Sequence, residues 1–134
     1  MGFEIINKIT NDNEKRDNLL IKAFVNYCVV KLGIKSDNFK IILLGKINDQ
    51  NITTGAYDRK DNIYARSEGR ALIDILRTIA HELVHMLQME RGDFKMNQPV
   101  QDVGGNIEDE ANAVAGQLIK SFKNDYDCTW IYSI

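Results

Sequence analysis

The chain has 134 residues, of which 44% are hydrophobic and 27% are charged, and its formal net charge at pH 7 is -2. This length and composition are typical of one globular domain, and we expect a single domain over residues 1–134. The near-neutral charge gives no general attraction to nucleic acid or to an anionic membrane, and no apolar run approaches the length of a transmembrane helix. We therefore expect neither nucleic acid nor a membrane among the partners.

The first half of the chain predicts one helix and several strands. Two short strand-like runs flank a polar turn over residues 58–62, which predicts an antiparallel hairpin. A helical pattern precedes Gly33, a residue type that commonly ends helices. We expect strands over residues 3–9, 39–47, 52–57 and 63–66, and a helix from about Asp12 or Asn13 to Lys31.

The second half predicts two helices separated by a loop. Apolar residues recur at helical spacing over about residues 70–90, and the spacing returns after Asn106, a good N-cap residue. The intervening segment contains the only proline and several glycines, which favours a loop. We expect the second of these helices to continue through Phe122 and the apolar tail, residues 127–134, to pack on the domain.

Two further features concern the cellular compartment. Residues 1–6 lack the basic region and the apolar run of a signal peptide. The two cysteines, Cys28 and Cys128, form no CxxC pair, and Cys28 has the sequence context of a small core residue. These features favour a cytoplasmic protein with reduced thiols.

The motif His81-Glu82-Leu83-Val84-His85 contains the only two histidines and lies in the first of the two later helices. Residues i and i+4 share a helix face, so that the two imidazoles can bind one Zn²⁺. Glu82 can then reach a metal-bound water as general base. The alternative is a chance pair of histidines on an ordinary helix. We favour the metal site because the helical context is present and carboxylates follow downstream.

A catalytic zinc ion needs three protein ligands and one open position. Because there is no third histidine, the third ligand should be a carboxylate, and Glu108, Asp109 and Glu110 compete for this role. Acidic residues in a first helical turn are usually solvated, and we favour this interpretation for Glu108 and Asp109. We expect Glu110 as the third ligand, because the small residues that follow it would let two helices approach closely.

The same motifs resemble a known group of enzymes. His81-Glu82-x-x-His85 followed by Glu110-Ala111-Asn112 resembles the gluzincin clan of zinc metallopeptidases, and the second segment is similar to one of the small ImmA/IrrE-type peptidases. Together with Thr54-Gly55-x-Tyr57, these motifs also resemble small metallopeptidases encoded by tailed bacteriophages. The resemblance covers roughly residues 52–120. It implies a zincin-like fold with a glutamate ligand on a later helix.

One position departs from the clan's pattern. The clan has an aspartate four residues after its third ligand, and Val114 stands at the corresponding position here. A hydrogen-bond partner for the first histidine would then come from elsewhere, and Asp74, Thr78 and Asn112 are the candidates. Gln88 shares the histidine face and would either line the cleft or belong to ordinary polar surface.

The implied mechanism is hydrolysis of a peptide bond, in which zinc acidifies a bound water and polarises the scissile carbonyl. Glu82 would take a proton from that water and return it to the leaving amine. A polypeptide substrate would add to an exposed strand, either residues 63–66 or the hairpin partner of that strand. The developing oxyanion needs a further donor, for which the sequence leaves five side chains open: Tyr57, Tyr64, Tyr126, Tyr132 and Arg91.

The sequence therefore predicts an α+β, minimal zincin-like domain. It would consist of an N-terminal helix, a small mostly antiparallel sheet, the HExxH helix and a C-terminal helix that carries the third ligand. The expected function is that of a zinc metalloendopeptidase, a hydrolase with His81, His85 and Glu110 as metal ligands and Glu82 as general base. A phage-encoded enzyme of this kind would act in the host cytoplasm.

The alternative function is that of a zinc-stabilised structural or binding protein, for example in a phage virion, with little or no catalysis. Glu82 argues against it, because a structural zinc site does not need this residue. A nucleic-acid-associated protease of the SprT-like kind is less favoured, since that group takes its third ligand from a histidine.

Overall fold

The apolar runs of the sequence form one sheet, with the most hydrophobic of them in its interior. The computed structural model describes residues 2–9, 18–45, 54–93 and 105–126. Within these residues the strands are β1 (Phe3–Asn7), β2 (Phe39–Leu44), β3 (Gly55–Tyr57) and β4 (Asn62–Arg66). They lie in the order β1-β2-β4-β3, so that β3 is an edge strand and β4 is interior.

The sheet is mixed, which corrects the expectation of a mostly antiparallel sheet. β1 pairs with β2 and β2 pairs with β4 in parallel, whereas β3 and β4 form the expected antiparallel hairpin. A parallel pair needs a long crossover, and a helix lies in the chain between β1 and β2. The sequence contains a signal for this arrangement, because residues 41–44 are all buried and form the continuous apolar run that is typical of a parallel strand.

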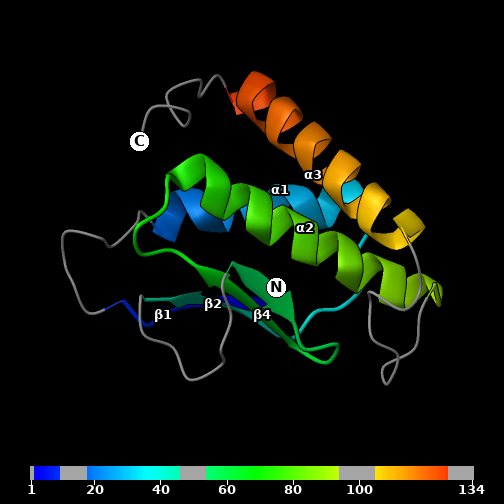
Figure 1. Ribbon diagram of the computed structural model, residues 1–134, viewed down its shortest axis with the longest axis horizontal. Coiled ribbons are helices and arrows are strands. Elements are labelled where there is room, and N and C mark those ends of the chain that lie inside the picture. The colour runs from blue at the N-terminus through cyan, green and yellow to red at the C-terminus, as the bar shows by residue number, and fades with distance from the viewer. Residues whose placement is uncertain (1, 10–17, 46–53, 94–104, 127–134) are drawn as a thin grey trace.

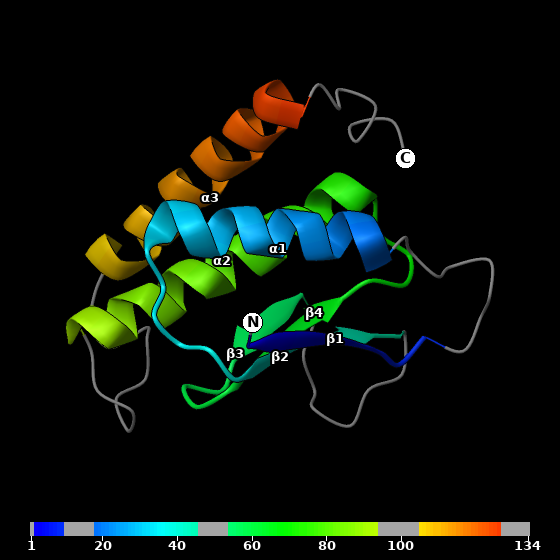
Figure 2. The same cartoon turned by 180° about the vertical axis from the view of Figure 1, so that it is seen from behind.

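Three helices accompany the sheet in the described part of the chain: α1 (Asn18–Leu32), α2 (Leu72–Arg91) and α3 (Gly105–Tyr126). α1 and α2 lie side by side over one face of the sheet, and α3 crosses α2 on the side away from the sheet (Figures 1 and 2). The described residues thus form an α+β arrangement in which α2 is the central element, since it contacts α1, α3, β3 and β4.

The observed helix bounds lie close to the expected ones. α2 begins at Leu72 and ends at Arg91, where Gly92 adopts φ 82° and its N–H donates to the carbonyls of Gln88 and Met89. A glycine suits this left-handed C-terminal position because a Cβ would be strained there. α3 extends to Tyr126, beyond the expected end at Phe122. The expected start of the first helix and the expected packing of residues 127–134 fall outside the described residues.

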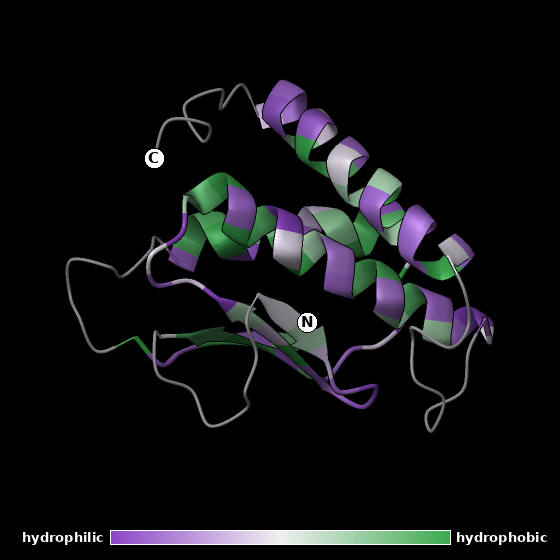
Figure 3. Ribbon diagram, in the orientation of Figure 1, coloured by the Kyte–Doolittle hydropathy of each residue, from purple (hydrophilic) through white to green (hydrophobic). Residues whose placement is uncertain are grey.

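The core is built from the apolar faces of the sheet and of all three helices. Phe24 of α1 and Phe122 of α3 are fully buried, with ring centroids 5.1 Å apart in an edge-to-face arrangement. Cys28 is fully buried with a free thiol, as expected of a core residue, and burial raises the pKa of this thiol. On α3, polar residues gather on the side away from α2 (Figure 3). No helix within the described ranges combines the length and apolarity that crossing a membrane requires.

Candidate metal centre

The two histidines of α2 converge on one point. His81 and His85 are one helical turn apart, and their Nε2 atoms lie 3.0 Å from each other. The two rings are nearly perpendicular, at 86°, with centroids 4.6 Å apart. The side chain of His81 is 18% exposed and that of His85 is 5% exposed, so that both imidazoles are largely removed from water. This is the convergence that the spacing of four residues predicts.

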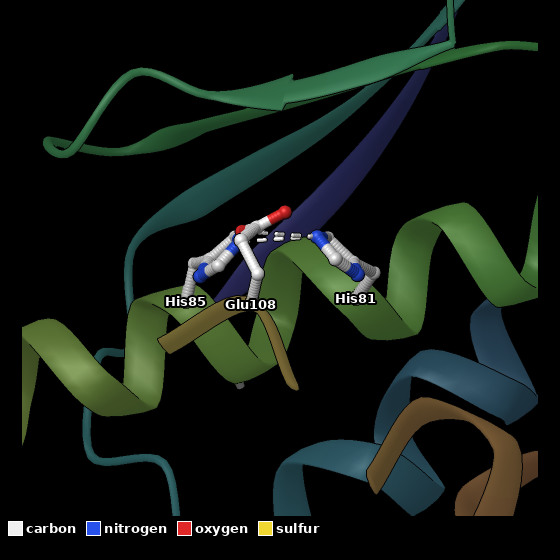
Figure 4. A group of neighbouring side chains, drawn as sticks. All are labelled: His81, His85 and Glu108. Atoms are coloured by element: carbon white, nitrogen blue, oxygen red, sulfur yellow. Dashed lines mark hydrogen bonds and ion pairs between the residues drawn. The ribbon is translucent and has the colours of Figure 1, made fainter. Parts of the chain in front are cut away.

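A carboxylate from α3 completes the group (Figure 4). Oε1 of Glu108 lies 2.7 Å from Nε2 of His85 and 3.6 Å from Nε2 of His81. The candidate ligand atoms of these three residues all lie within 4.8 Å of one another. At zinc–ligand bond lengths of about 2.0–2.2 Å, tetrahedral ligand atoms stand roughly 3.3 Å apart. The observed separations bracket this value, and the donor set of two imidazoles and one carboxylate suits zinc.

The carboxylate that meets the histidines is that of Glu108, which corrects the expectation for Glu110. Oε1 of Glu110 instead accepts a hydrogen bond of 2.8 Å from Nε2 of Gln88 and forms an ion pair with Arg91. The reason is helical geometry. Ala111 and Ala115 are the fully buried residues through which the first half of α3 packs, and Glu108 precedes Ala111 by three residues on that face. Glu110 is rotated about 200° from Glu108 and cannot share this direction.

A signal in the sequence could have identified Glu108. Extending the buried face of α3 back by one turn reaches position 108, whereas the choice of Glu110 relied on the small residues after it and on a resemblance. Asp109, the third competitor, is exposed. The expectation that Glu108 is a solvated first-turn residue is only partly correct. Its side chain is 44% exposed, but its carboxylate contacts both imidazoles.

Glu82 lies beside this group and is almost fully buried, with 9% exposure. Burial, together with the charge of Glu108, raises the pKa of Glu82 to about 8. Burial also lowers the pKa of His81, with His85 acting in the same direction, which favours the neutral imidazole that a metal ligand must be. The arrangement therefore combines an imidazole whose neutral form is favoured, that of His81, with the carboxyl group of Glu82, which can hold or release a proton near neutral pH.

The structure separates the three candidates for a partner of His81. The side chain of Asn112 on α3 hydrogen-bonds to His81. Thr78 instead accepts a hydrogen bond of 2.8 Å from Nη2 of Arg70, and Asp74 forms an ion pair of 3.2 Å with Arg77. Asn112 is thus the one of the three candidates that contacts the first histidine.

Two open cavities flank the group, and both are lined by His81, Glu82 and Glu108. The first, of about 350 Å³, lies along the N-terminal half of α2 and has polar walls. The second, of about 340 Å³, follows β3. The other residues that line the first cavity are Thr54, Arg70, Asp74, Arg77, Thr78 and Asn112, and those that line the second are Gly55, Ala56, Tyr57, Arg59 and His85.

Among the five expected oxyanion donors, Tyr57 is the one that lines these cavities in the described part of the chain. Burial and the nearby acidic side chains raise the pKa of Tyr57 to about 12, so that its hydroxyl keeps its proton. Arg91 pairs with Asp93 and Glu110, and Tyr126 packs against Tyr27 and Phe122. Tyr64 lines neither cavity, and Tyr132 lies outside the described residues.

Comparison of the chain with protein-family models, with curated protein sequences and with solved structures finds no match. The assignment of a function therefore rests on the residues of the cleft themselves.

Proposed function

We propose that this chain is a zinc-dependent metallopeptidase of minimal zincin-like architecture, with His81, His85 and Glu108 as the metal ligands. The observation that carries the proposal is the place of Glu82. Its carboxyl group is buried beside the three ligand atoms and lines both open cavities. A structural zinc site is closed by four protein ligands and needs no such group.

A zinc ion held by the three residues would supply Lewis-acid polarisation of a carbonyl and acidification of water. The chain supplies the remaining parts of the reaction. Glu82 accepts the proton of the attacking water and passes it to the leaving amine, a task for which a carboxyl pKa above its ordinary value is suited. Tyr57 lines the same cavity as Glu82 and keeps its proton at neutral pH, so that it would donate a hydrogen bond to the oxyanion.

The sheet supports binding of an extended polypeptide. The sequence left open whether residues 63–66 or the hairpin partner would receive the substrate, and β4 is interior because it pairs with both β2 and β3. β3 is the edge strand on this side, and Gly55, Ala56 and Tyr57 line the cavity next to Glu82. A peptide that added to β3 by main-chain hydrogen bonds would pass beside His81, His85 and Glu108, which we call the metal group.

The second candidate function, a zinc-stabilised binding or structural protein, is favoured by one observation. The ligands come from two helices, so that a metal ion would cross-link α2 to α3. Such a link stabilises the protein whether or not the site is catalytic. The two functions differ in what they require of Glu82.

The test uses the zinc-loaded protein, a set of unstructured polypeptides and Glu82→Gln, with Glu90→Gln as the matched control on the same helix. We expect wild type and Glu90→Gln to cleave peptide bonds. Glu82→Gln should lose about 10²–10⁴-fold in kcat/KM while it keeps its zinc. Cleavage by Glu82→Gln at the wild-type rate would contradict the mechanism. Zinc binding without cleavage by wild type would favour the structural role.

A further inference from the structure

Gln88 is a fully buried amide on the far side of His85 from the metal group. It is 0% exposed and lies on α2 three residues after His85, one turn further along the same face. A buried amide is costly unless its polar atoms are hydrogen-bonded. Oε1 of Gln88 lies 2.7 Å from Nδ1 of His85, and Nε2 donates to the carbonyl oxygen of Ile107 at 3.0 Å and to Oε1 of Glu110 at 2.8 Å. All of its polar atoms therefore have partners.

These partners determine the orientation of the amide. The carbonyl oxygen of Ile107 and the carboxylate of Glu110 both accept hydrogen bonds, so the NH₂ group of Gln88 must face them. Oε1 then faces His85, and an amide oxygen can only accept. Nδ1 of His85 must accordingly carry a proton, so that Nε2, which faces Glu108 and His81, is the ring nitrogen that can bind a metal ion.

Glu110 is in turn held by α2. It forms an ion pair with Arg91, the last residue of that helix, and Arg91 also binds Asp93 at 2.6 Å. The contacts form a chain from Arg91 through Glu110 and Gln88 to His85. These contacts join the last turns of α2 to the beginning of α3, and the same two helices supply the candidate metal ligands.

We propose that Gln88 and Glu110 are positioning residues of the metal centre. Glu110 orients the Gln88 amide, and the amide keeps the His85 proton on Nδ1, so that Nε2 can bind the metal ion. Glu110 thereby has a defined role although its carboxylate is not a ligand. The proposal rests on the proposed metal site, but not on catalysis. Groups that orient metal-bound histidines typically contribute 10–100-fold to metal affinity.

The experiment reads the tautomer and the metal affinity separately. The chain has two histidines, so that labelling with ¹⁵N-histidine gives two sets of ring signals, which a His81→Ala variant assigns. In the metal-free wild type we expect Nδ1 of His85 to carry a proton. Gln88→Leu removes the acceptor of this proton while Glu108 still faces Nε2, so we expect a population of the Nε2–H tautomer to appear, together with a roughly 10–100-fold loss of zinc affinity.

Two further variants keep the test decisive. Glu110→Gln preserves the shape and one acceptor for Gln88, and we expect a smaller loss of zinc affinity than in Gln88→Leu, with the His85 tautomer retained. Gln117→Leu, at an exposed glutamine of α3, should change neither readout. A fixed Nδ1–H tautomer and wild-type zinc affinity in Gln88→Leu would overturn the proposal. Zinc binding without peptide cleavage in wild type would overturn the proposed peptidase function alone. The tautomer of His85 in the metal-free protein tests the role of Gln88 independently of zinc binding and of cleavage.

Discussion

Gly55 of β3 lies directly against Thr78 of α2, so that a Cβ atom at position 55 would stand 2.3 Å from Cγ2 of Thr78. The same point is 2.9 Å from the carbonyl oxygen of Tyr64 and 3.7 Å from Cγ of Glu82. The missing side chain lets the edge strand approach the helix face that carries Glu82. This close approach positions β3 along one wall of the cleft.

Gly55→Ala should therefore destabilise the protein by about 1–3 kcal/mol, because the added methyl group must displace the helix or the strand. Urea unfolding measures the loss. Gly55→Ala combined with Thr78→Ser removes Cγ2 but keeps the hydroxyl that accepts from Arg70. We expect this pair to recover part of the stability, since the contact with the Tyr64 carbonyl remains. Wild-type stability in Gly55→Ala would contradict the close approach.

The packing of α3 on α2 sets the position of Glu108. Ala111 is fully buried one turn after Glu108, whereas Ala113 is exposed. Ala111→Leu should force the helices apart, cost about 1–3 kcal/mol and weaken zinc binding, because Glu108 would be displaced from the histidines. Ala113→Leu adds the same atoms to the exposed side. Zinc titration of both variants checks this, and equal affinities would contradict the role of the helix contact.

The hydrogen bonds of Glu90, which lies outside the metal group, predict that the stability of the protein depends on pH. Burial alone would raise the pKa of Glu90, but hydrogen bonds from the N–H groups of Lys35 and Ser36 and from the Ser36 hydroxyl lower it below its ordinary value of 4.5. A depressed carboxyl pKa stabilises the folded state above the unfolded pKa, and the contribution is lost as pH falls through the folded pKa.

We expect Glu90→Gln to lower the free energy of unfolding at pH 7 by about 1 kcal/mol or less, because Glu90 is exposed and the interaction is screened. The difference between wild type and variant should shrink as the pH falls below 4.5. Urea unfolding at pH 7, 5 and 3.5 measures it. A difference that stays constant across this range would mean that the ionised carboxylate contributes nothing.

Local patterns in the sequence predicted the elements well. The spacing of His81 and His85, the apolar periodicity over residues 70–90 and the hairpin around residues 58–62 all depend on neighbours within a few positions, and the structure confirms them. The parallel pairing of β1 with β2 was missed because it depends on the path of a crossover and not on local alternation.

The identity of the third carboxylate depends on how two helices pack. Glu108 and Glu110 are two residues apart, and either could be favoured by composition alone. The rotation of α3 about its axis decides between them, and that rotation is set by Ala111 and Ala115. Gln88 was expected to line the cleft or to belong to ordinary surface. Its burial depends on the start of α3, where the carbonyl oxygen of Ile107 accepts a hydrogen bond from it, and this contact between two helices has no local signal in the sequence.

The most direct test of the metal centre is a zinc titration of wild type, Glu108→Ala and Glu110→Ala side by side. We predict about one zinc per chain for wild type, loss of tight binding in Glu108→Ala, and retained binding in Glu110→Ala that is roughly 10–100-fold weaker. Loss of zinc from Glu110→Ala with full retention in Glu108→Ala would show that Glu110 is the ligand. A wild-type protein that binds no zinc would contradict the metal centre as a whole.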